Sequence, residues 1–229
     1  MGEWFASIAE SFEKCFIRDD RYLMLLDGVG VTIKISLLAV VIGLIIGLLI
    51  AMCGLSKKKP LRAIGKVYTD IIRGTPSVTQ LMIIYFVVFA TVMWPKWIIA
   101  AIAFGINSGA YVSEVIRAGI LSVDRGQMEA GRSLGLSAKQ TMISIIIPQA
   151  LKNIFPALGN EFITLIKETA IVGYVGLVDI QKAGDFIKSQ TYTAFMPLIG
   201  TAVIYFVIIK VLTILLGVLE RRLRRSEQR

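Results

Sequence analysis

The 229-residue chain contains no histidine, only two cysteines, and charged residues at just 18% of its positions. The absence of histidine excludes imidazole acid–base catalysis and histidine metal ligands, and Cys15 and Cys53 are too few to form a zinc site. A soluble domain carries roughly a quarter charged residues, so this low charge, with 55% hydrophobic residues, argues against a soluble enzyme. Disorder is excluded as well, because it requires low hydrophobicity. We expect both cysteines to be unpaired thiols.

The chain also lacks a nucleotide-binding loop. The nearest approach, Gly65-Lys66, is followed by Val67 where a Mg²⁺-binding Ser or Thr is required, and Pro60 stands where the first glycine is required. A Ser/His/Asp set and a CxxC pair are missing too. We therefore predict no catalytic site, metal site or cofactor on this chain, so that any ATP and Mg²⁺ must be bound by a partner.

Long windows without charge divide the chain into membrane-spanning segments. A spanning helix needs about 20 apolar residues, and a charge in the middle of the bilayer is costly. Four such windows predict helices at 28–55, 68–93, 97–121 and 195–219. A fifth span is predicted at 140–177, where an apolar stretch is interrupted by charged residues and by Pro148 and Pro156. The expected fold class is therefore an all-α polytopic membrane protein with about five transmembrane helices.

The basic residues of the loops predict the orientation of these spans. Fourteen Lys and Arg fall on one side, in segments 56–73, 122–139 and 221–229, and six fall on the other, in 1–27, at Lys96 and in 179–193. The side richer in Lys and Arg is usually cytoplasmic. We expect a cytoplasmic-membrane protein with an external or interfacial segment 1–27, a transmembrane domain 28–220, and a basic cytoplasmic tail 221–229 that meets anionic lipid rather than nucleic acid.

Two glycine pairs, Gly43-x-x-x-Gly47 and Gly105-x-x-x-Gly109, lie within the apolar segments. This spacing lets two helix backbones approach closely. The contact it predicts forms either inside the chain or between two copies of it.

The connection at 126–148 is unusually long and glycine-rich. It carries Gly131 and Gly135, and an apolar run of about eight residues then leads to Pro148. A short helix, a glycine turn and a proline-limited helix would form a knob that projects from the membrane. Such a knob is either a docking element or a passive loop.

This connection resembles the EAA loop of ABC-importer permease subunits, whose pattern is E-A-A, three residues, G, nine residues, I-x-L-P. Here Glu129-Ala130-Gly131, Gly135 and 145–148 (I-I-I-P) keep that spacing, with Gly131 in place of the third Ala and Ile147 in place of Leu. The resemblance implies that Glu129, Ala130, Gly131, Gly135 and Pro148 couple the permease to a separate ATPase.

Further stretches resemble the polar amino acid permeases of the histidine, glutamine and arginine type. They are 73–76 (RGTP), 108–120 (SGAYVSEVIRAGI), 159–162 (GNEF) and 167–169 (KET). The likeness covers about residues 27–220. It implies a type I ABC-importer permease fold with a cytoplasmic coupling helix, which pairs with a copy or paralogue of itself, binds two ABC ATPase subunits, and receives a polar amino acid from an external solute-binding protein.

Polar residues inside the predicted spans are candidates for function. Glu161, Thr164 and Glu168 lie along one stripe of a helix, with Lys167 beside it. The stripe is either a substrate pathway or a charge-paired contact between helices.

Glu114 and Arg117 stand three residues apart, a spacing that allows a structural ion pair within one helix. Taken together, these features predict the permease subunit of an ATP-driven importer of polar L-amino acids. The alternative is an ion- or proton-coupled secondary carrier, or a channel, that works without an ATPase and uses the intramembrane acids for coupling.

Overall fold

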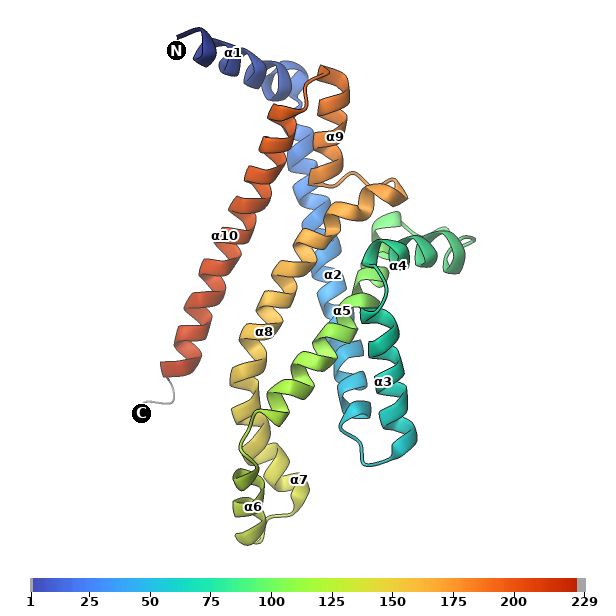
Figure 1. Ribbon diagram of the computed structural model, residues 1–229, viewed down its shortest axis with the longest axis vertical. Helices are drawn as coiled ribbons and strands as arrows, with labels where there is room; N and C mark the ends of the chain where they lie inside the picture. Colours follow the sequence, from blue (N-terminus) through green and yellow to red (C-terminus); the bar gives the residue numbers. More distant parts are fainter. Residues whose placement is uncertain (1, 226–229) are drawn as a thin grey trace. The chain divides into compact units, whose positions relative to one another are not determined.

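The computed structural model describes residues 2–225, and every regular element among them is a helix, which confirms the all-α fold class. The α-helices are α1 (Gly2–Phe12), α2 (Tyr22–Gly54), α3 (Lys59–Arg73), α4 (Ser77–Ile83), α5 (Lys96–Leu121), α6 (Arg125–Ser133), α7 (Ala138–Thr141), α8 (Ile147–Glu168), α9 (Ile180–Thr191) and α10 (Phe195–Arg225) (Figure 1). Shorter π-helical or 3₁₀ segments extend several of these, at Glu13–Ile17, Arg18–Asp20, Ile84–Val88, Met142–Ile146 and Thr169–Val175. Of the predicted basic tail, residues 226–229 lie outside the described part of the chain.

Four helices in the described part of the chain are long and apolar enough to cross a membrane, at Tyr22–Gly54, Lys96–Leu121, Ala138–Val175 and Phe195–Arg221. A fifth span results if Lys59–Arg73 and Ser77–Val88 are counted as one broken span. This agrees with the expected total of about five.

The second span differs from the single helix expected at 68–93. Helix α3 begins earlier, at Lys59, and ends at Arg73, and α4 begins only at Ser77. Pro76 explains the break, because proline has no N–H to donate and disfavours the α conformation in the residue before it. The Gly74 N–H still donates to the Asp70 carbonyl and closes the last turn of α3.

The chain divides into two compact units, and the long helices α2, α5, α8 and α10 each contribute to both. Unit 1 comprises Met1–Ala39, Ser77–Phe104 and Thr164–Val211. Its buried cluster joins the N-terminal segment to α2 and α9 and consists of Cys15, Phe16, Leu25, Ala183 and Ile187. Both cysteines of the chain are unpaired, and Cys15 is fully buried, with Sγ 3.2 Å from the Thr193 hydroxyl oxygen.

Unit 2 comprises Val40–Pro76, Gly105–Ile163 and Leu212–Arg229. Both glycine pairs are used inside it, where α2 packs against α5. A Cβ at Gly47 would lie 2.4 Å from Val112, and a Cβ at Gly109 would lie 2.7 Å from Ile46. These contacts leave no room for a side chain at the crossing, so the glycine spacing serves packing within the chain.

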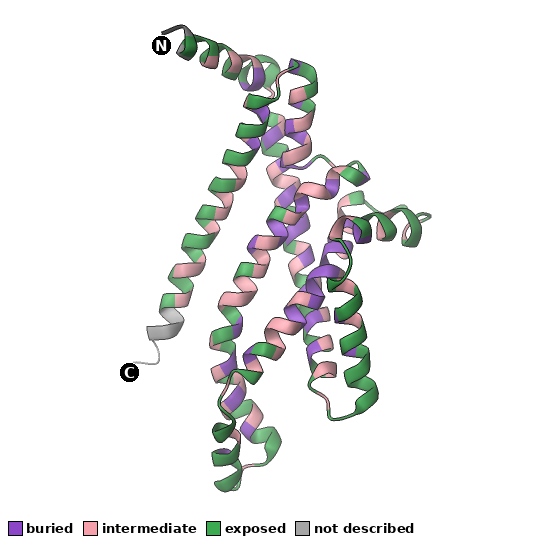
Figure 2. Cartoon of the chain, in the orientation of Figure 1, coloured by how far each residue is buried: buried purple, intermediate pink, exposed green. Residues whose placement is uncertain are grey.

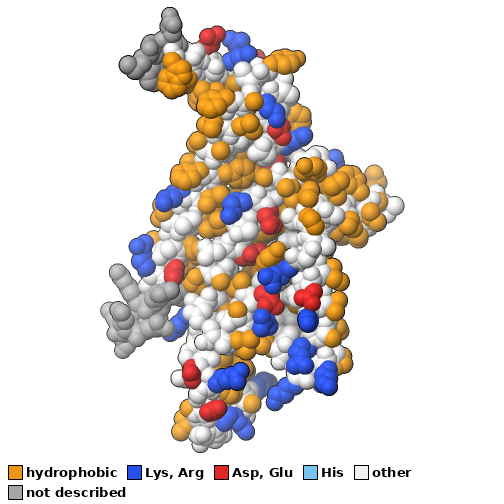
Figure 3. Space-filling model, in the orientation of Figure 1, with side chains coloured by type: hydrophobic (Ala, Val, Ile, Leu, Met, Phe, Trp, Pro, Cys, Tyr) orange, Lys and Arg blue, Asp and Glu red, His pale blue; other side chains and the backbone are white. Residues whose placement is uncertain are grey.

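Helix α5 is the most buried of the spanning helices, with 67% of its most apolar window buried, against none of the corresponding window of α10 (Figure 2). Apolar side chains that stay exposed on a helix of this length are suited to lipid or to another membrane chain. Within unit 2, basic side chains gather over the turn between α2 and α3 and over α6 and α7 (Figure 3). That end of unit 2 is the one predicted to be cytoplasmic.

Candidate functional sites: coupling loop, polar helix and charged cavity

The candidate coupling loop is a helix–turn–helix in unit 2. Asp124 caps α6, because its Oδ1 accepts a hydrogen bond from the Gly126 N–H at 2.6 Å. The chain then turns at Gly135, which has a φ of +85°, a conformation that residues other than glycine disfavour. Ser137 and Gln140 cap α7 reciprocally through side-chain and backbone hydrogen bonds. Every change of direction in the loop is therefore set by a local residue choice.

Gly131 is the buried position of α6. An added Cβ would lie 2.5 Å from Cγ2 and 2.9 Å from Oγ1 of Thr141, which is itself fully buried at the end of α7. The Thr141 hydroxyl also donates to the Ser137 carbonyl at 3.0 Å, which holds the side chain in place. This close packing accounts for glycine at a position where the EAA pattern has alanine.

The opposite face of the loop is exposed. Glu129 and Ala130 are both exposed on α6, and Leu134, at the turn, is 82% exposed.

Pro148 does not end a helix, which corrects the expectation of a proline-limited segment. It occupies the first turn of α8, and the π-helical segment Met142–Ile146 connects α7 to α8 without a break. Because the helix continues through this position, Pro148 has no N–H to donate to the preceding turn, and the π-helical turn before it accommodates the altered hydrogen-bond pattern. The helix therefore runs on from the coupling loop into the membrane-spanning segment.

Glu161 lies on α8 in unit 2 and is partly buried. Its Oε1 accepts a hydrogen bond from the Ser108 hydroxyl of α5 at 3.0 Å, and Ser108 is fully buried. A carboxylate in apolar surroundings needs such a donor. Sequence reasoning did not identify Ser108, because it is separated from Glu161 by 53 residues.

The other residues of the predicted stripe follow Glu161 on the same helix, but they belong to unit 1. Thr164 and Glu168 are partly buried, whereas Lys167 is exposed. That these residues form one stripe, and that the stripe is a substrate pathway, both stay predictions.

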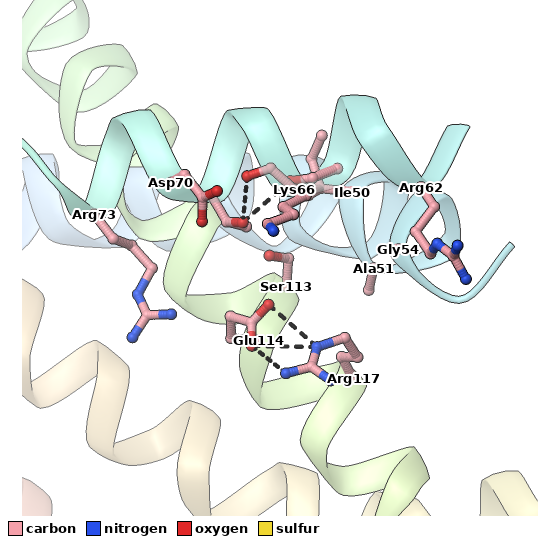
Figure 4. A pocket seen from close by; sticks show the side chains of 12 residues that line it. Ile50, Ala51, Gly54, Arg62, Lys66, Asp70, Arg73, Ser113, Glu114 and Arg117 are labelled. Carbon is pink, nitrogen blue, oxygen red and sulfur yellow. Dashed lines mark hydrogen bonds and ion pairs between the residues drawn. The ribbon is translucent and has the colours of Figure 1, made fainter. Parts of the chain in front are cut away.

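Glu114 and Arg117 form the ion pair that their spacing allows. Arg117 Nη2 lies 2.6 Å from Glu114 Oε2, and Arg117 Nε lies 3.2 Å from each carboxylate oxygen. This pair forms one wall of a cavity of about 370 Å³ in unit 2 (Figure 4). The other charged residues of the cavity come from α3 and are Arg62, Lys66, Asp70 and Arg73. Of these, the sequence singles out only Arg73, as the first residue of the stretch 73–76.

Unit 1 contains a buried acid that the sequence reading missed. Asp179 is fully buried and caps α9 through the N–H groups of Gln181 and Lys182, and it also accepts a hydrogen bond from the Tyr205 hydroxyl at 2.9 Å. Burial raises the pKa of Asp179 above the usual aspartate value, although these hydrogen bonds lower it in part. An Asp directly before the first apolar residue of a helical period, here Ile180, is a recognisable N-cap signal.

Comparison with known proteins identifies the family. Residues 43–225 match the family described as binding-protein-dependent transport system inner membrane component. The chain is 42% identical to the putative glutamine transport system permease protein GlnP of Rickettsia bellii (strain RML369-C), over 93% of this chain and 98% of that protein. It is 40% identical to the arginine transport system permease protein ArtQ of Bacillus subtilis (strain 168), over 89% of this chain and 94% of that protein.

A solved structure agrees with these relatives. The crystal structure of an amino acid ABC transporter with histidines contains a chain that is 44% identical to this one, with a TM-score of 0.83, over 90% of this chain and 98% of that chain. The family match alone covers well over half of the sequence. The chain is therefore a multi-pass member of the family of binding-protein-dependent transport system inner membrane components.

Proposed function

We propose that this chain is the membrane-spanning permease subunit of an ATP-driven importer of polar amino acids. The observation that carries the proposal is the exposed helix–turn–helix of α6 and α7, which keeps the spacing of an ATPase-coupling loop and is continuous with the spanning helix α8. Relatives of similar length have names that specify glutamine or arginine transport. We infer that ATP and Mg²⁺ are bound by partner ATPase subunits.

The assembly we propose has two permease protomers, two ATPase subunits and an external solute-binding protein. The excess of basic residues in 56–73 and 122–139 favours a cytoplasmic coupling loop and an external N-terminus. In this arrangement, ATP-driven closure of the ATPase subunits moves α6, and the continuous helix from α7 into α8 transmits that movement into the membrane.

We also propose that the substrate pathway runs along the polar stripe of α8, with Glu161, Thr164 and Glu168 on one face and Lys167 beside it. The hydrogen bond from Ser108 to Glu161 supports this proposal, because it keeps a carboxylate fixed on a spanning helix.

Crosslinking tests the proposed function. A cysteine introduced at Leu134, at the tip of the loop, should form a crosslink to an ATPase chain in intact membranes, in a background in which Cys53 is replaced by serine. Ser189, which is exposed on α9, provides the matched control, because it lies in a segment predicted to be external and its cysteine variant should capture no ATPase. Equal capture at both positions, or none at Leu134 in a protein that still supports uptake, would contradict the proposal.

A further inference from the structure

Beside the cavity between α2, α3 and α5, the backbones of α2 and α3 are in close contact. Gly65 of α3 packs so closely on α2 that an added Cβ would lie 3.1 Å from the Gly54 nitrogen and 3.2 Å from the Ile50 carbonyl oxygen. This contact brings the polar face of α3 opposite α5 and leaves a space of about 370 Å³ between them. The volume is sufficient for a small polar solute together with some water.

Charged side chains surround this space from two helices. Arg62, Lys66 and Arg73 project from α3, with Asp70 among them, and the Glu114–Arg117 pair faces them from α5 (Figure 4). Glu114 and Arg117 neutralise each other through the contacts described above. In the described part of the chain, Arg62, Lys66 and Arg73 form no ion pair. Among the described residues, three cations therefore face a single unpaired carboxylate, so the cavity has an excess of positive charge. Asp70 still offers a carboxylate to a cationic group.

The two faces of α3 indicate where a ligand comes from. Ile64, Val67 and Ile71 are each more than half exposed, and at 100° per residue they lie on the face opposite Arg62, Lys66 and Arg73. The apolar face is suited to lipid tails. The cavity faces away from it, so a water-soluble ligand is a better match for it than a lipid headgroup.

We propose that this cavity is a second binding site for an amino acid zwitterion, at the cytoplasmic end of the permease, where imported solute is held before release. Arg73 receives the α-carboxylate, because a guanidinium presents paired donors in a planar fork and its position is fixed 5.3 Å above the Tyr111 ring. Lys66 adds a second positive charge, and Asp70 meets the ammonium group. This inference rests on the proposed function and assigns a second binding site to the same solute.

Protection from thiol labelling tests this site in the full-length permease with its ATPase, reconstituted in nanodiscs. The labelled variant is Arg62→Cys, at the wall of the cavity, with Cys53 replaced by serine; L-glutamine and L-arginine are the probes. At a probe concentration of about ten times Kd, mass action predicts that labelling by a charged thiol reagent slows by about tenfold. Lys59→Cys, which lies on the same helix but does not line the cavity, should label at an unchanged rate.

Further variants separate a binding site from a folding effect. Adding Arg73→Gln or Asp70→Asn should abolish protection while the ATPase still co-purifies, and agmatine, which lacks the carboxylate of arginine, should not protect. Protection by inorganic phosphate, or protection that requires anionic lipid in the nanodisc, would overturn the assignment to an amino acid. If the complex imports one of the probes but neither probe protects Arg62→Cys, this inference fails alone; if it imports no amino acid at all, the proposed function fails.

Discussion

Replacing Gly131 by alanine places a methyl group in space that Thr141 already fills. The new Cβ would lie 2.5 Å from Thr141 Cγ2, whereas carbon atoms pack best at about 3.5–4.0 Å. Thr141 is buried and its hydroxyl is hydrogen-bonded to the Ser137 carbonyl, so rotation would cost that bond. Overpacking of this kind costs about 1–3 kcal/mol. Alanine gains about 1 kcal/mol over glycine in a helix interior, so we expect a net loss of about 1 kcal/mol.

The prediction changes sign when Thr141 is shortened. In a Thr141→Ala background both overlapping Thr141 atoms are absent, and the next nearest atom is Ile145 Cδ1 at 3.2 Å, the end of a flexible side chain. Gly131→Ala should then stabilise the loop by about 1 kcal/mol through helix propensity. The coupling between the two substitutions should therefore be about 1–3 kcal/mol.

Hydrogen exchange of the backbone amides of residues 125–141 measures this coupling as a local opening free energy. The number of ATP molecules hydrolysed per amino acid imported should rise in Gly131→Ala and return toward the wild-type value in the double variant. Gly30→Ala is the matched control, because an added Cβ there meets nothing within 4 Å. If Gly131→Ala has the same effect in both backgrounds to within about 0.5 kcal/mol, Thr141 is not what constrains position 131.

Two further predictions concern Glu161 and Asp179. Glu161→Gln keeps the shape of the side chain but removes its charge. If Glu161 contacts the substrate, the lost charge-assisted contact is worth about 1.5–3 kcal/mol, which predicts a drop in uptake of about ten- to hundredfold. ATPase assembly should stay intact. Ser108→Ala, which removes only the hydrogen bond, should have a smaller effect, and unchanged uptake in Glu161→Gln would exclude Glu161 from the pathway. Burial raises the pKa of Asp179, so the folded protein binds that proton more tightly than the unfolded chain does. Stability should then fall as the pH rises from the ordinary aspartate value of about 4 through the raised value. The Asp179→Asn variant should show a flatter dependence of its melting midpoint on pH, and identical slopes for both proteins would refute the assignment.

Charge patterning was sufficient to predict about five spans but not the form of the second one. The charge-free window begins at Gly74, after α3 has already ended. Helix α3 is amphipathic and carries Lys and Arg on one face, so a search for uncharged residues passes over it. An amphipathic period would have identified it, and Pro76 would have placed the break.

Contacts within one helical turn were predictable, and contacts between helices were not. Glu114 and Arg117 are three residues apart, so any helix brings them together. The partner of Glu161 depends on how α5 packs against α8 in unit 2, and nothing near Glu161 in the sequence indicates Ser108. Gly131 illustrates an intermediate case, because the departure from the EAA pattern was visible in the sequence, whereas its cause, Thr141, became clear only from the packing of α6 on α7.

The basic residues at 56–73 serve two purposes that composition alone cannot separate. Lys57, Lys58 and Lys59 are consecutive, so they point in different directions around the turn and have no common target, as expected of a topology signal. Arg62, Lys66 and Arg73 follow at separations of four and seven residues, which place them on a single helical face, opposite the exposed apolar one. Orientation in the membrane requires only that positive charge be present on one side. The apolar face of α3 accounts for cations on the opposite face. It does not require that three of them line one cavity beside Asp70 and the Glu114–Arg117 pair, and a carboxylate-bearing solute gives that arrangement a use.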